Sequence, residues 1–100
     1  MENLNAIEAS LNQARQCVEQ GDAVTGVALL TGLITSLDKE LESAPDSKVT
    51  SLLAQACLLR GRLLLQMGMA APAQQDAERA VKLDPSLASV NGKFEAEGKD

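Results

Sequence analysis

Residues 53–86 read LAQACLLRGRLLLQMGMAAPAQQDAERAVKLDPS, and small residues recur among them at intervals that predict two closely packed helices. Gly61 offers a point of close approach on the first helix, and Gly68 offers a place for that helix to end. Ala73 and Ala80, seven residues apart, share one face of the second helix. An Asp-Pro pair follows, and because proline keeps the preceding residue out of helical geometry, the second helix is expected to end there.

Apolar residues spaced by three and four predict helices in the rest of the chain as well. Asp22 follows a turn glycine and Asp46 follows a proline, and both are good N-terminal caps for the helices after them. Gly26 and Gly32 each cost a helix about 1 kcal/mol relative to alanine, so we expect a neighbour pressed against each of them. The fold class is therefore all-α, with helices predicted over residues 3–20, 23–43, 47–67, 71–83 and 86–97.

The order of small residues in the second half of the chain resembles the tetratricopeptide repeat, a helix-turn-helix unit of about 34 residues. The large residues of that family are replaced: its tryptophan slot holds Cys57, its tyrosine slot holds Leu64, and the leucine slot before the first glycine holds Arg60. The alternative is an ordinary helical hairpin that needs glycine and alanine at its crossing. The matching positions are Gly61, Gly68, Ala73, Ala80 and Pro85.

The first hairpin is a weaker copy of the second. Gly21 aligns with the turn glycine at position 68, although the offset of 47 residues is longer than the usual period. The resemblance implies a single domain over residues 1–100, built as a short right-handed solenoid of stacked antiparallel hairpins. Its parts would be a degenerate repeat at about 7–43, a repeat at about 54–87 and a C-terminal capping helix at about 87–97.

Composition argues against several classes of function. The net charge is −5 and Phe94 is the only aromatic residue, whereas nucleic-acid binding needs clustered cations and stacking platforms. No apolar run approaches the roughly 18 residues of a membrane span. The start, MENLNAIEAS, lacks the regions of a signal peptide, so we expect a cytoplasmic protein.

The residues give little support to catalysis. Histidine, the commonest general base, is absent. Cys17 and Cys57 lie in apolar stretches typical of buried, inert thiols, and their spacing matches no metal motif. Acidic pairs such as Asp76 and Glu78 are interpreted as solvated faces. We therefore expect no enzyme, no cofactor and no metal.

Binding remains, and the resemblance implies where it would occur. In tetratricopeptide repeats, the first helix of each repeat lines a concave groove that takes a peptide or a helix. Arg15 and Arg62 each stand six residues before a turn glycine, and their planar guanidinium groups suit a carboxylate of a partner. The alternative is that the two arginines pair with Glu8 or Glu19. The groove positions carried over are Leu11, Arg15, Val18, Gln55, Leu58, Arg62, Leu65 and Gln66.

Two functions follow as hypotheses. The first is a protein-protein interaction module, an adaptor or a chaperone-like scaffold, that binds a partner peptide or helix in this groove. The second is a self-associating structural domain, a homodimer with no peptide ligand, that buries surplus apolar surface at Leu58, Leu64 and Leu65.

Overall fold

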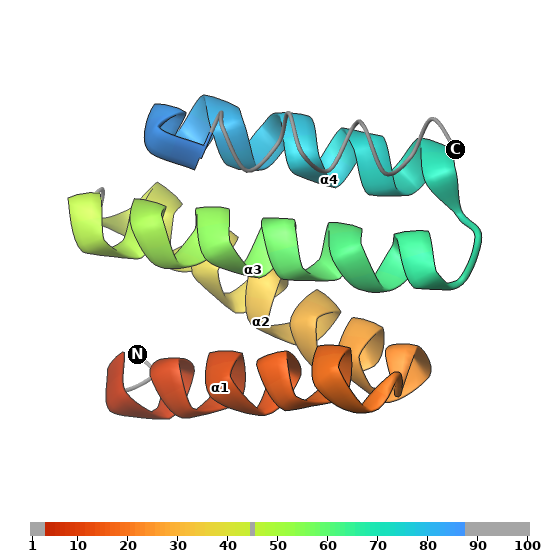
Figure 1. Cartoon of the computed structure of the whole chain (residues 1–100). Helices are drawn as coiled ribbons and strands as arrows, with labels where there is room; N and C mark the ends of the chain where they lie inside the picture. Colours follow the sequence, from red (N-terminus) through yellow and green to blue (C-terminus); the bar gives the residue numbers. More distant parts are fainter. Residues whose placement is uncertain (1–3, 45, 88–100) are drawn as a thin grey trace.

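The chain folds into helices joined by short turns. The computed structural model describes residues 4–44 and 46–87, and this part contains four α-helices, a short 3-10 helix and no strand (Figure 1). The all-α prediction is confirmed, with helix ends within a residue of those expected from the sequence. The helix predicted over 86–97 lies, beyond Leu87, outside the described residues. The elements are α1 (Leu4–Gln20), α2 (Ala23–Ser43), α3 (Ser47–Gln66), α4 (Ala70–Leu83) and η1 (Pro85–Leu87).

Aspartate caps and turn glycines mark the ends of the helices. An Asp22 side-chain oxygen accepts a hydrogen bond from the backbone N–H of Thr25 at 3.4 Å, and Asp46 accepts one from Lys48 at 2.7 Å. Each bond satisfies a donor that a helix start leaves unpaired. Gly21 and Gly68, in the two turns, have φ values of +73° and +78°, which glycine adopts without the steric cost of a Cβ. The same device therefore closes both hairpins.

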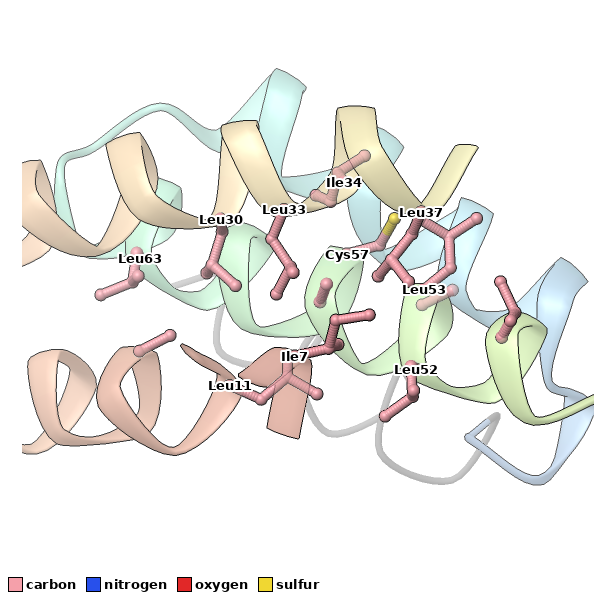
Figure 2. Packing of buried hydrophobic residues seen from close by; sticks show 14 residues of the cluster. Ile7, Leu11, Leu30, Leu33, Ile34, Leu37, Leu52, Leu53, Cys57 and Leu63 are labelled. Atoms are coloured by element: carbon pink, nitrogen blue, oxygen red, sulfur yellow. The ribbon is translucent and has the colours of Figure 1, made fainter. Parts of the chain in front are cut away.

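Helix α3 occupies the centre of the fold. It contacts α1, α2 and α4, while α1 also contacts α2 (Figure 1). The main core forms where α1, α2 and α3 meet, and Ala80 of α4 also belongs to it (Figure 2). A smaller cluster of Leu64, Ala73 and Ala77 joins α3 to α4. Cys17 and Cys57 are buried, as predicted. The largest fully buried side chains are Leu11, Leu30, Leu37, Leu53, Leu63 and Cys57.

The two glycines within α2 have opposite surroundings. A Cβ at Gly26 would collide with a methyl group of Leu63 and would lie 3.0 Å from the Cβ of Cys17, so the expected close neighbour is present there. The same expectation is wrong for Gly32, which is exposed and has open space where a Cβ would stand. The apolar spacing predicted that both glycines lie within a helix, but it did not predict which of them faces a neighbouring helix.

Alanine substitutions at these glycines are expected to change stability in opposite directions. Gly32→Ala should raise the free energy of unfolding by about 1 kcal/mol, because it gains helix propensity without a collision. Gly26→Ala should lower it by about 1–2 kcal/mol, because the new methyl group would force the fully buried Leu63 side chain to shift. Chemical denaturation of both variants and the parent chain measures the difference, and a stabilised Gly26→Ala variant would contradict the close packing at this point.

Candidate interaction surface

A hollow of about 260 Å³ lies between α1 and α3, and we call it the first hollow. Three residues expected at the groove from the sequence, Leu11, Arg15 and Gln55, are part of its lining. Asn12 and Lys48 line it too, although no pattern in the sequence pointed to them. The full lining is Glu8, Leu11, Asn12, Arg15, Lys48, Ser51, Leu52 and Gln55.

A second hollow, of about 180 Å³, lies further along the same two helices. Its lining is Val18, Arg62, Leu65 and Gln66, and all four residues were expected at the groove from the sequence. Leu58, the remaining predicted residue, lines neither hollow, and it is half-buried against the main core. We call the residues of the two hollows together the α1/α3 face.

Neutral side chains hold Arg15 in place over the first hollow. Its two terminal nitrogens donate to the Asn12 side-chain oxygen at 2.8 Å and to Gln55 Oε1 at 2.9 Å. The nitrogen of the same Gln55 amide donates to Ser51 Oγ at 3.5 Å, and Gln66 donates to the backbone carbonyl of Val18 at 3.4 Å. The Arg15 guanidinium is therefore oriented, while its positive charge is not compensated by a carboxylate.

Positive charge predominates on the α1/α3 face. Of the charged residues in the two linings, Arg15, Lys48 and Arg62 are basic and only Glu8 is acidic, although the whole chain has a net charge of −5. Glu8 pairs with Lys48 at 3.8 Å, and both side chains are exposed. Arg62 is half-buried, and the described residues provide it with neither an ion pair nor a hydrogen bond.

The alternative pairing considered from the sequence is not found. Within residues 4–44 and 46–87, neither Arg15 nor Arg62 forms an ion pair with Glu8 or Glu19. Glu8 instead forms an ion pair with Lys48, because the first turn of α3 lies beside the part of α1 that carries Glu8. Among the described residues, Arg15 and Arg62 of the α1/α3 face thus have no carboxylate partner, whereas Lys48 has one.

A partly buried ion pair lies between α3 and α4. Arg60 donates to both carboxylate oxygens of Asp76, at 2.7 and 2.8 Å, and this hydrogen bonding raises the pKa of Arg60. Asp76 is only 7% exposed, so its interpretation as part of a solvated face is wrong. Arg60 also reaches Thr31 on α2, at 3.5 Å. The one signal in the sequence was Arg60, a charged residue at a position where the repeat motif has leucine, because such a residue calls for an acidic partner.

A second ion pair, between Arg79 and Asp38, joins α4 to α2. The hydrogen bond to Asp38 raises the pKa of Arg79. Burial raises the pKa of the Cys57 thiol. The positive charges of Arg79 and Arg60 act in the opposite direction but offset only part of this increase. The thiol therefore stays protonated and unreactive near neutral pH.

Comparison with known proteins finds no matching family model, no significantly similar curated protein and no significantly similar solved structure. The resemblance to tetratricopeptide repeats thus stays a prediction. None of the helices in the described part is both long and apolar enough to span a membrane. The same part holds no grouping of three or more side chains suited to a metal ion.

Removal of the buried acid should cost more stability than removal of the exposed ion pair. Asp76→Ala leaves the Arg60 charge without a partner in a site where that side chain is 22% exposed, and we expect a loss of about 2–3 kcal/mol in the free energy of unfolding. Arg79→Ala is the control, because its pair with Asp38 is about 40% exposed, and such pairs contribute about 0–1 kcal/mol. Equal losses in urea denaturation would contradict this ranking.

The Cys57 thiol should react slowly in the folded chain. A Cys17→Ala variant leaves Cys57 as the single thiol, and its labelling by a thiol-specific reagent at pH 8 should be at least about a hundredfold slower than in denaturant. Burial and the raised pKa both act in this direction. Labelling at the rate of a free thiol under native conditions would show that this part of α3 is open.

Proposed function

We propose that this chain is a protein-protein interaction module whose α1/α3 face binds an acidic segment of a partner protein. The observation that carries the proposal is the excess of basic over acidic side chains in the two hollows of a chain with net charge −5. Arg62 adds to it, since a half-buried guanidinium without a partner among the described residues gains most from an incoming carboxylate.

The proposal includes the architecture expected from the sequence. The two hairpins are taken as successive units of a short, right-handed solenoid of tetratricopeptide type, with α1 and α3 as the first helix of each unit. Two observations support this reading: α3 contacts α1 as well as α2 and α4, and both turns use a glycine with positive φ. In this role the chain acts in the cytoplasm as an adaptor or a chaperone-like scaffold.

Binding is favoured over catalysis by the chemistry of the face. Its polar side chains are guanidinium, ammonium, amide and hydroxyl groups with one exposed carboxylate, which suit recognition of a partner's charge. The thiol of Cys57 lies outside both linings, and burial keeps it protonated. We therefore propose no enzymatic activity.

The homodimer has less support than the sequence suggested. Leu64, one of three leucines assigned to its interface, is only 8% exposed, and Leu58 and Leu65 are half-buried against the core clusters. Less apolar surface therefore remains at these residues for a second copy to cover. Light scattering distinguishes the two functions, because a tight dimer that Leu58→Ser and Leu65→Ser dissociate would favour self-association.

Peptide selection tests the proposed function directly. From a displayed library of peptides of about 20 residues, we expect the chain to enrich acidic sequences whose affinity falls about tenfold with Arg62→Ala, the loss expected for one charge-assisted hydrogen bond. Arg15→Ala should also weaken binding. Lys39→Ala is the matched control, because it removes an exposed positive charge from α2, away from both hollows. Selected peptides that bind the Arg15→Ala/Arg62→Ala variant as tightly as the parent would refute the proposal.

A further inference from the structure

We infer that the partner segment is an α-helix that presents two carboxylates seven residues apart, one for Arg15 and one for Arg62. This inference rests on the proposed function and specifies its ligand. It follows from the spacing of the two arginines, from the state of the amide side chains around them, and from the apolar residues in the two hollows.

The spacing comes from the helices that carry the two cations. The hydrogen bond of 2.9 Å between Arg15 and Gln55 places the Arg15 guanidinium at the level of Gln55 on α3. Arg62 is two helical turns further along α3, a distance of about 10.5 Å at 1.5 Å per residue. On a partner helix that lies along α3, residues seven apart cover the same distance and lie on the same face.

The amides of the face favour a helical partner over an extended one. An extended segment brings unpaired backbone N–H and C=O groups, which the walls would have to satisfy. Gln55 already uses both ends of its amide, on Arg15 and Ser51, and Gln66 already donates to the Val18 carbonyl. A helix satisfies its own backbone and presents only side chains, so it fits a face on which the Gln55 amide is fully used and the Gln66 amide nitrogen is already engaged.

Apolar residues share the lining of each hollow with its arginine. Leu11 and Leu52 belong to the first hollow, and Val18 and Leu65 belong to the second. Between two acids seven residues apart, the positions three and four residues after the first acid lie on the same helix face. We therefore expect apolar side chains at those positions of the partner.

The charges at the far end of the first hollow limit the motif to two acids. Glu8 lies there, paired with Lys48. A third carboxylate one further repeat along the partner would meet the like charge of Glu8, and it would have to compete with Glu8 for Lys48. The segment that accepts acids therefore extends from Arg15 to Arg62.

Designed helical peptides test the inference. The probes are peptides of about 18 residues with blocked ends, stapled on the face opposite the acids so that all are helical. One peptide carries two glutamates seven positions apart with leucines between them, and its isomer carries the same residues with the glutamates five positions apart, on different faces. Fluorescence anisotropy should give an affinity about tenfold higher for the first peptide.

Variants of the chain assign this preference to the two arginines. Arg15→Ala and Arg62→Ala should each lower the affinity for the seven-spaced peptide about tenfold and the affinity for the five-spaced isomer by much less. Lys39→Ala should leave both affinities unchanged. Arg62→Glu should restore binding to a seven-spaced peptide whose matching glutamate is replaced by lysine. Circular dichroism confirms that each variant remains helical.

The outcomes separate the inference from the proposed function. If both peptides bind equally well and both depend on the arginines, the two-carboxylate helix is wrong and the acidic-partner function stands. If neither peptide depends on Arg15 or Arg62, both proposals fail. A spacing preference that disappears in the two arginine variants, with rescue by the charge swap, supports the inference.

Discussion

Leu63 of α3 lies over Gly26 of α2, and Cys17 of α1 meets the same point. The close packing of α1, α2 and α3 depends on this contact, because a Cβ at residue 26 would collide with a Leu63 methyl group and crowd Cys17. With no aromatic residue among those described, the core gains its density from leucine, isoleucine, valine and alanine, which bury enough surface only when helices approach closely. The contact lies where α1, α2 and α3 meet, and the shared core of these helices places α1 alongside α3, where the hollows form.

The two sides of α3 use different polar chemistry. Towards α4, Arg60 is bound to Asp76 in a partly buried, bidentate pair that fixes the second hairpin. Towards α1, the cross-helix contact of Arg15 is with the neutral amide of Gln55. A carboxylate neutralises a cation, whereas an amide orients it and leaves the charge in place. The ion pair that stabilises the fold therefore lies on the α4 side of α3, and the guanidinium group without a carboxylate partner lies on the α1 side.

The sequence predicted the parts of this arrangement that depend on local pattern. Caps, turn glycines and apolar spacing located the helices, and the position of Arg62 relative to the turn at Gly68 was enough to place it on the side of α3 that lines the second hollow. The burial of Asp76 could not be read in the same way, because it depends on an arginine 16 residues away across a turn. Gly32 shows the same limit, since periodicity does not say which side of α2 has a neighbour.

The proposed acidic partner would meet a chain whose overall charge repels it, and the range of each interaction decides the result. The net charge of −5 acts over distances at which salt screens it, since the Debye length is about 8 Å at physiological ionic strength. The cations of the α1/α3 face act at contact, where screening is weak and a half-buried guanidinium such as Arg62 is only partly hydrated. Overall repulsion therefore penalises acidic segments that lack matching carboxylates. In the proposed role, the cations would favour segments that have them, so the acidic surface would add to the selectivity of the face.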